Sequence, residues 1–197
     1  GVLAGFNTDV TGIASAIRRA CSQADRALPT NAVVLGARAT ASSALAALGE
    51  LGIVASTVAA RRFGGPGSVV AASSRLGVSI DQVLWSDHDA VLRALSGADL
   101  VISTLPAGVA DPLAEQMSVR EGQVLLDVVY SPRETALRSV FERNGGIVAE
   151  GTDMLIFQAA AQVQLMTGRS PKTEVMRGAL EAELARRARA SGGGAAS

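Results

Sequence analysis

Short apolar runs alternate along this chain with longer segments in which apolar residues recur every three or four positions. The runs have the length and the Val, Ile and Leu content of buried strands, and they lie at 32–35, 53–59, 78–85, 99–104, 124–129 and 147–149. The longer segments have helical spacing and lie at 10–27, 37–51, 68–76, 87–96, 133–144, 154–166 and 172–189. This alternation predicts an α/β fold, namely a Rossmann-like, doubly wound parallel sheet of about six strands with flanking helices.

The turn after the first strand is the clearest candidate site. A strand that ends at Gly36 and leads directly into a helix is typical of the first βα unit of a dinucleotide-binding fold, and the amides of the helix N-terminus suit a pyrophosphate. The fingerprint Gly-x-Gly-x-x-Gly/Ala is matched at Gly36 and Ala41, but Arg38 takes the place of the second glycine. Two alternatives follow: Arg38 turns outward and its charge binds phosphate, or its side chain blocks the pyrophosphate. The candidate phosphate-binding residues are Gly36, Ala37, Arg38, Ala39 and Thr40.

The end of the second strand bears on the choice of cofactor. NAD-specific folds carry an acidic residue there, about 20 positions past the glycines, which binds the ribose 2′-hydroxyl. This chain has Ala60-Arg61-Arg62 instead, with no carboxylate. Two guanidinium groups suit a 2′-phosphate, which favours NADP and makes NAD the less expected cofactor. The alternative is an exposed basic loop without a ligand.

Composition and charge exclude several classes of protein. The 197 residues include 18 basic and 18 acidic side chains, so no strongly charged face is expected and nucleic acid is not an expected partner. With one cysteine, Cys21, and one histidine, His88, the sequence predicts neither an intrachain disulfide nor a metal site. Cys21 is expected as a small apolar residue on a helix and His88 as a solvated residue at a helix start.

The organisation of the chain is expected to be simple. We expect one nucleotide-binding domain over residues 1–190 and a disordered tail over 191–197, where Gly, Ala and Ser predominate. There is no secretory signal and no apolar run of membrane-spanning length, so a cytoplasmic protein without a membrane partner is expected. The first residue is Gly1 rather than Met, which suggests that the sequence begins inside a longer protein.

Two further segments flank the predicted elements. Asn7-Thr8-Asp9 precedes the first predicted helix, and in isolation Asp9 is interpreted as a helix cap. Leu105-Pro106-Ala107-Gly108 follows the fourth strand. Ligands of open α/β sheets bind at the carboxyl ends of the strands, so this loop is predicted to line the cofactor.

Several separated motifs together resemble one family, the shikimate dehydrogenases, including the quinate/shikimate dehydrogenases. The resemblance is to their carboxyl-terminal, nucleotide-binding part and covers positions 5 to about 168. It rests on Asn7-Thr8-Asp9-Val10-Thr11-Gly12, Val34-Leu35-Gly36-Ala37, Arg61, Ser103-Thr104-Leu105-Pro106-Ala107-Gly108, Asp127-Val128-Val129-Tyr130-Ser131-Pro132 with Thr135 and Leu137, and Gly151-Thr152-Asp153-Met154-Leu155 with Gln158 and Gly168.

The resemblance implies a function and a set of site residues. Such an enzyme reversibly reduces 3-dehydroshikimate to shikimate with NADPH, and it acts as a monomer or homodimer without nucleic acid or membrane partners. Asp9 matches the catalytic Asp, while Tyr130 and Gln158 match substrate contacts. Residues expected beside the nicotinamide and its ribose are Val128, Gly151, Met154, Thr104, Leu105 and Pro106. The family's amino-terminal domain, which carries a catalytic Lys, does not appear in the sequence, so this chain alone is expected to be inactive.

The departures from the family keep two alternatives open. The family loop Gly-Ala-Gly-Gly-Ala-Ala is Gly36-Ala37-Arg38-Ala39-Thr40-Ala41 here, so both later glycines are absent. One alternative is a quinate/shikimate dehydrogenase that uses NAD. The other is a non-catalytic relative with a degraded phosphate loop, for which Arg38 is the motive. The joint presence of Asp9, Tyr130 and Gln158 counts against the second alternative.

Overall fold

Six parallel strands form one sheet in the order β3-β2-β1-β4-β5-β6. The computed structural model describes residues 5–65, 67–131 and 134–192. The strands are β1 (Asn31–Leu35), β2 (Ala55–Ala60), β3 (Asp81–Leu84), β4 (Leu100–Ser103), β5 (Val124–Asp127) and β6 (Ile147–Ala149). Every neighbouring pair is parallel, and the strand order reverses between β1 and β4. This arrangement confirms the predicted doubly wound α/β fold.

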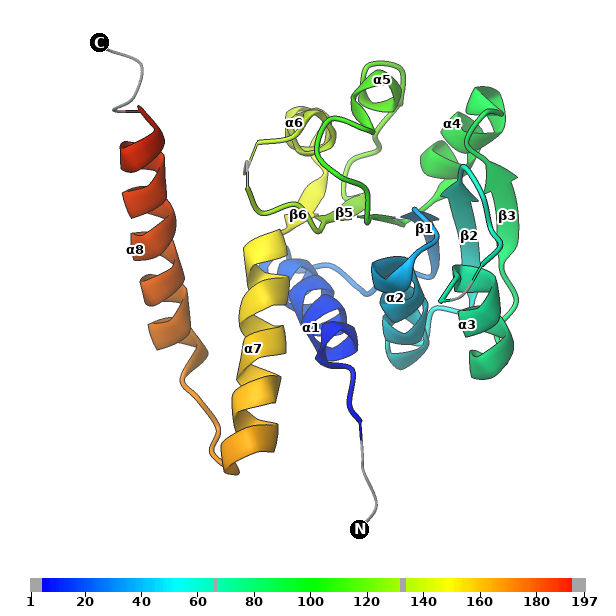
Figure 1. Ribbon diagram of the computed structural model, residues 1–197. Helices are drawn as coiled ribbons and strands as arrows, with labels where there is room; N and C mark the ends of the chain where they lie inside the picture. The colour runs from blue at the N-terminus through cyan, green and yellow to red at the C-terminus, as the bar shows by residue number, and fades with distance from the viewer. Residues whose placement is uncertain (1–4, 66, 132–133, 193–197) are drawn as a thin grey trace.

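Helices cover both faces of the sheet (Figure 1). One layer contains α1 (Thr8–Gln23), α2 (Ala39–Glu50), α3 (Val69–Leu76) and α7 (Gly151–Thr167); the other contains α4 (His88–Gly97), α5 (Asp111–Ala114) and α6 (Ala136–Arg143). Successive strand residues point to opposite faces, and both faces are apolar. In β1, Ala32 and Val34 join the core beneath the first layer, whereas Val33 and Leu35 join the core beneath the second. Burial on both faces explains why the strands are apolar runs without alternation.

Several predicted boundaries were wrong by a few residues, and the two at helix ends have a local cause. The first helix ends at Gln23 rather than Ala27, because the chain turns at Asp25 with φ 51° and the Arg26 amide donates to the Cys21 carbonyl at 2.9 Å. The strand bounds are also narrower than predicted: β2 begins at Ala55 and β5 ends at Asp127. Helix α6 begins at Ala136 rather than 133, because Thr135 caps it. The sequence pattern missed α5, which has only four residues.

The interpretation of Asp9 as a helix cap was wrong. Asn7 is the N-cap of α1, and its side-chain oxygen accepts the Asp9 amide at 3.0 Å. The other end of the Asn7 amide group donates to the Ser43 hydroxyl at 2.9 Å, which ties the start of α1 to α2. The Asp9 carboxylate is half-buried in the first turn, and it is not needed for capping.

The last helix, α8 (Thr173–Gly192), packs beside α7 at the edge of the domain (Figure 1). Asp153 in the first turn of α7 is buried, and it pairs with Arg19 of α1 at 3.3 Å and with Arg177 of α8. This ion cluster therefore joins three helices. Helix α8 continues past Arg189 and into the first two residues of the predicted tail, while 193–197 lie outside the described residues.

Two other residues have the surroundings expected from the sequence. Cys21 is buried in α1, and burial raises the pKa of its thiol, as expected for a small apolar core residue. His88 is exposed at the start of α4. Within the residues that the structure describes, no helix has the length and apolar character needed to cross a membrane.

Asp99 is expected to stabilise the amino-terminal edge of the sheet in a pH-dependent way. Its carboxylate accepts the Thr30 hydroxyl at 2.7 Å and the Thr30 amide at 3.1 Å, and Arg120 lies 3.4 Å away; the Thr30 hydrogen bond lowers the pKa of Asp99 below its ordinary value of 3.8. A lowered pKa gives stability that is present above the ordinary pKa and is lost as the pH falls toward the folded-state value. We expect Asp99→Asn to lower the free energy of unfolding by about 1 kcal/mol at pH 7. In urea titrations across pH, this deficit should narrow below about pH 4; a deficit that is independent of pH would contradict the assignment.

Candidate functional site

The turns after β1 and β4 meet where the strand order reverses. The Thr104 amide and hydroxyl both donate to the Leu35 carbonyl, at 2.9 and 2.7 Å, and the Gly36 amide donates to the Ala59 carbonyl at 2.9 Å. Gly36 has φ 110°, and a Cβ atom at this position would collide with the Thr104 hydroxyl oxygen. Glycine is therefore required both by the backbone angle and by the lack of space. The crevice at this point is where open α/β sheets bind their ligands.

The N-terminus of α2 follows directly after this turn. Arg38 is the N-cap residue, and within the described residues no side chain makes a capping hydrogen bond to the helix. The first-turn amides of α2, at Ala39 and Thr40, therefore have no capping acceptor, and the positive end of the helix dipole suits an anion. Ala39 is exposed and Thr40 is half-buried.

Arg38 adopts a conformation that carries no strain. Its φ of −102° and ψ of −163° lie in the extended region, which any residue adopts. Its side chain is exposed and forms no hydrogen bond or ion pair with a described residue. The guanidinium group is therefore available to a ligand at the start of α2.

Two further guanidinium groups follow β2, the strand that pairs with β1. Arg61 and Arg62 follow β2, are exposed, and have no hydrogen-bond or ion-pair partner in the described part of the chain. The loop after them is held against the β1–α2 turn, because the Val69 amide donates to the Ala37 carbonyl at 3.1 Å. The Ser42 hydroxyl of α2 also donates to the Gly67 carbonyl at 3.3 Å. These contacts place the end of the loop that follows Arg61 and Arg62 next to the N-terminal part of α2.

Helices α1 and α7 bring two other predicted residues to neighbouring surfaces. They approach closely at Gly12, where a Cβ atom would lie 2.6 Å from the Met154 carbonyl oxygen and 3.1 Å from the Gln158 Cβ. Asp9 lies one helical turn before Gly12. The Thr8 hydroxyl accepts the Gln162 amide at 3.2 Å, which fixes the same pair of helices one turn further along.

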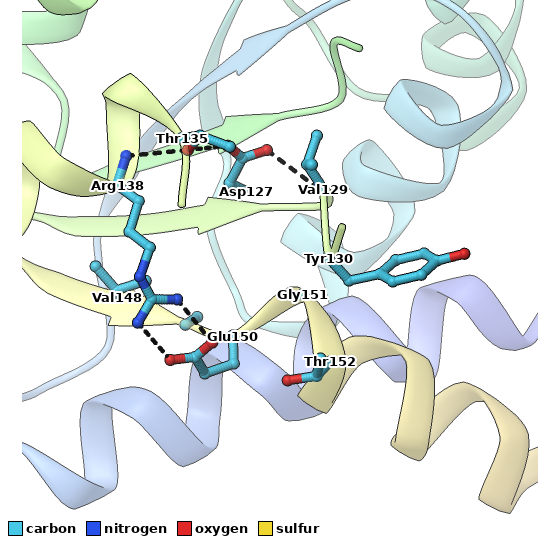
Figure 2. A pocket seen from close by; sticks show the side chains of 10 residues that line it. Asp127, Val129, Tyr130, Thr135, Arg138, Val148, Glu150, Gly151 and Thr152 are labelled. Atoms are coloured by element: carbon cyan, nitrogen blue, oxygen red, sulfur yellow. Dashed lines mark hydrogen bonds and ion pairs between the residues drawn. The ribbon is translucent and has the colours of Figure 1, made fainter. Parts of the chain in front are cut away.

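The end of β5 meets the start of α7. A Cβ atom on Gly151 would lie 2.7 Å from the Asp127 carbonyl oxygen and 3.1 Å from that of Val129, so only glycine allows this approach. Val128 packs against the core beside Met154, which is buried. Tyr130 follows on the loop, 45% exposed, and its ring points away from Asp127 and Thr135 (Figure 2).

A cavity next to Tyr130 contains polar residues to which the sequence analysis gave no role (Figure 2). Asp127 accepts the Thr135 hydroxyl at 2.8 Å, and Arg138 forms two bonds of 2.8 Å with the Glu150 carboxylate. Desolvation raises the pKa of Asp127, and the bonds to Glu150 raise the pKa of Arg138. A carboxylate that ends a buried apolar strand is the sequence signal that identifies Asp127.

The structure thus places most predicted site residues along one edge of the sheet. Those that follow strand ends are Gly36, Ala37, Arg38, Arg61, Arg62, Thr104, Leu105, Pro106, Val128, Tyr130, Gly151 and Met154. Asp9 and Gln158 lie on α1 and α7, and no hydrogen bond links their side chains to each other or to Tyr130 within the described residues. Pro132 of the Tyr-x-Pro motif lies outside those residues. The described part of the chain contains no group of His, Cys, Asp and Glu side chains that could hold a metal ion.

The strand order and the open helix N-terminus at its reversal define a Rossmann-like α/β domain. A family model described as Shikimate 5'-dehydrogenase C-terminal domain matches residues 151–181. A protein of Geobacter sp. strain M21 named Shikimate dehydrogenase (NADP(+)) is 33% identical over 94% of this chain and 64% of its own length. Over most of its length, the chain is therefore similar to part of the shikimate dehydrogenases.

Solved structures show the same similarity. The crystal structure of Mycobacterium tuberculosis shikimate dehydrogenase is 34% identical, with a TM-score of 0.74 over 87% of this chain and 61% of that protein. The Thermus thermophilus enzyme in complex with NADP(H) and shikimate is 28% identical, with a TM-score of 0.66 over 93% of this chain and 63% of that protein. The chain thus spans less than two thirds of the length of the relatives compared here.

Proposed function

We propose that this chain is the cofactor-binding part of an NADP-dependent shikimate dehydrogenase, which reversibly reduces 3-dehydroshikimate to shikimate. The observation that carries the proposal is the sheet edge at the strand reversal, where the N-terminus of α2 follows β1 and where Arg38, Arg61 and Arg62 follow the ends of β1 and β2 with exposed side chains. Two relatives support it, because one is named for NADP(+) and a solved structure holds NADP(H) and shikimate.

The residues present fit a nicotinamide dinucleotide with a 2′-phosphate. Gly36 leaves the turn without a side chain, so that a pyrophosphate can approach the first-turn amides of α2. Arg61 and Arg62 are free to bind the 2′-phosphate, and the loop has no carboxylate to accept a ribose hydroxyl. Thr104, Leu105 and Pro106 would lie along the ribose. When bound, the cofactor supplies or accepts the hydride.

The chain's own residues take the remaining roles. We assign Asp9 to proton transfer at the substrate oxygen, together with a Lys supplied by another part of the enzyme. Tyr130 and Gln158 offer hydrogen bonds to the substrate's hydroxyl and carboxylate groups, while Val128, Gly151 and Met154 form the apolar wall beside the nicotinamide. The Asp9 carboxylate suits this role because it forms no hydrogen bond or ion pair with a described residue, and because Asn7 rather than Asp9 caps the helix.

Arg38 is assigned to the pyrophosphate. Its extended backbone and exposed side chain support the alternative in which the charge turns outward and binds phosphate, rather than the one in which it blocks the site. Because a guanidinium reaches several ångströms from its backbone, it replaces the close approach that the family's glycine gives. Salt should weaken this contact.

Calorimetric titration of the chain with NADP⁺ and then NAD⁺ tests the proposal. We expect NADP⁺ to bind and NAD⁺ to bind at least tenfold more weakly, because each charge-assisted contact to the 2′-phosphate contributes on the order of 1.4 kcal/mol or more. Arg61→Ala should reduce NADP⁺ affinity about tenfold and leave NAD⁺ affinity unchanged. Arg75→Ala is the matched control, because Arg75 is exposed at the far end of α3.

Other outcomes would change the assignment. Equal affinity for NADP⁺ and NAD⁺, unaffected by Arg61→Ala, would show that Arg61 does not bind the 2′-phosphate. It would favour an NAD-dependent enzyme. If neither cofactor binds, Arg38→Gly decides: restored binding would identify Arg38 as a blocking residue and favour a non-catalytic relative, whereas continued absence of binding would contradict the cofactor role of this edge.

A further inference from the structure

The loop that carries Tyr130 is anchored by one buried carboxylate. Asp127 is 7% exposed, and its two oxygens accept bonds from both ends of the loop: the Val129 amide at 3.2 Å and the Thr135 hydroxyl at 2.8 Å. Since a carboxylate is an acceptor on both oxygens, it can hold both donors at once. The loop between these anchors therefore has fixed ends.

Thr135 couples this carboxylate to α6. Its hydroxyl donates to Asp127 and accepts the Arg138 amide at 3.2 Å, which makes it the N-cap of α6. Arg138 in turn binds the Glu150 carboxylate at the entrance to α7. A continuous chain of bonds thus runs from the end of β5, through α6, to the start of α7 (Figure 2).

Close packing against α7 also restricts the loop that carries Tyr130. Gly151 lies directly against the carbonyl groups of Asp127 and Val129, so the loop cannot move toward α7. Tyr130 is the first residue past these contacts, and its ring points away from Asp127 (Figure 2). Because Tyr130 directly follows Val129 in the chain, its backbone position depends on where Val129 is held. The loop's position is therefore determined by the Asp127 bonds and by this close contact.

We propose that Asp127 and Thr135 are positioning residues for Tyr130: by holding the Val129 amide and the Thr135 hydroxyl together, the carboxylate fixes the loop that presents the phenol at the edge of the sheet. The role of the phenol as a hydrogen-bonding group for a polyhydroxylated carboxylic acid rests on the proposed function. The positioning itself is a property of this chain without any ligand.

The positioning depends on pH. Burial raises the pKa of Asp127 above the ordinary range of an aspartic acid, and the nearby Asp111 acts in the same direction, while the bonds from Thr135, Val129 and Ser103 oppose it. The other charged or titratable groups around the same cavity are Tyr130, Arg138 and Glu150. Protonation removes one acceptor of the carboxyl group, so the loop should loosen at a higher pH than an ordinary aspartate would require.

Tyr130 is the chain's one tyrosine, which gives the test a single signal. The chain is labelled with 3-fluorotyrosine, and its ¹⁹F resonance is followed against pH together with the exchange rate of the Val129 amide. We expect the resonance to shift with an inflection above the ordinary Asp range. Asp127→Asn should abolish that inflection, and Thr135→Val should move the resonance and speed Val129 exchange about tenfold, because one hydrogen bond is lost or weakened.

Two variants separate positioning from general loss of stability. Thr135→Ser keeps the hydroxyl and should restore both the resonance and the exchange rate. Asp87→Asn changes an aspartate elsewhere, the N-cap of α4, which accepts the Ala90 amide at 3.0 Å, and should leave both readouts unchanged. An unaltered resonance, inflection and Val129 exchange rate in folded Asp127→Asn and Thr135→Val would overturn the proposal.

The proposed cofactor function and the positioning role of Asp127 can be contradicted independently of each other. The fluorine and exchange readouts use no cofactor or substrate, so an absence of NADP⁺ binding would leave them interpretable. Conversely, selective NADP⁺ binding without any response of the Tyr130 resonance to Asp127→Asn would support the proposed function and contradict the positioning role of Asp127.

Discussion

Gly36→Ala is expected to lower the free energy of unfolding by about 2–4 kcal/mol and to abolish cofactor binding. Two costs combine: the φ of 110° is strained for any residue with a Cβ atom, and that atom would collide with the Thr104 hydroxyl oxygen. The hydroxyl would have to leave the Leu35 carbonyl, to which it donates at 2.7 Å. Chemical denaturation gives the stability, and NADP⁺ titration of the folded variant gives the binding.

Gly52 provides a matched control for the cost of placing alanine at a positive φ angle. Gly52 has φ 76° and no atom near its would-be Cβ, so Gly52→Ala should cost only about 1 kcal/mol, and cofactor binding should persist. Thr104→Ala removes the obstructing oxygen. The double variant Gly36→Ala/Thr104→Ala should therefore be more stable than the sum of the single losses predicts. Strict additivity would show that the collision with Thr104 contributes nothing.

The sheet was predictable because its physical signal is local. Strands buried on both faces must be apolar throughout. From composition and length alone, β6 was located correctly at 147–149 and β1 was located to within one residue, at 32–35 against the observed Asn31–Leu35. The end of each helix depends on single hydrogen bonds instead. The turn at Asp25 and the cap at Thr135 fix two ends that no periodicity in the sequence marks.

The candidate site also has some features that the local sequence predicts and others that only the tertiary structure shows. Gly36 and Arg61 could be predicted as site residues because the turn after a strand has a recognisable spacing, and the strand order brings them to one edge. Whether Arg38 turns outward depends on its backbone angles, which the sequence left open. The bonds from Asp127 to Thr135 and from Arg138 to Glu150 join residues whose pairing follows only from the tertiary structure. The family motif marked Asp127 and Thr135 without indicating that they contact each other.

Gly12→Ala is expected to lower the free energy of unfolding by about 1–3 kcal/mol, although alanine is the better helix former by about 1 kcal/mol. The added Cβ atom would lie 2.6 Å from the Met154 carbonyl oxygen, which belongs to the backbone of α7 and cannot rotate away. The two helices must then separate. Since Asp9 lies on α1 and Gln158 on α7, their spacing should increase together with the loss of stability.

Gly178→Ala distinguishes this effect from helix propensity. Gly178 lies inside α8 with no atom near its would-be Cβ, so alanine there should raise the free energy of unfolding by about 0.5–1 kcal/mol. Opposite signs for the two Gly→Ala variants in urea titrations would establish close packing as the cause at Gly12. Hydrogen exchange should accelerate in α1 of Gly12→Ala and remain unchanged there in Gly178→Ala. A stabilised Gly12→Ala would mean that α1 and α7 tolerate a wider separation, and the relative placement of Asp9 and Gln158 would then not depend on this glycine.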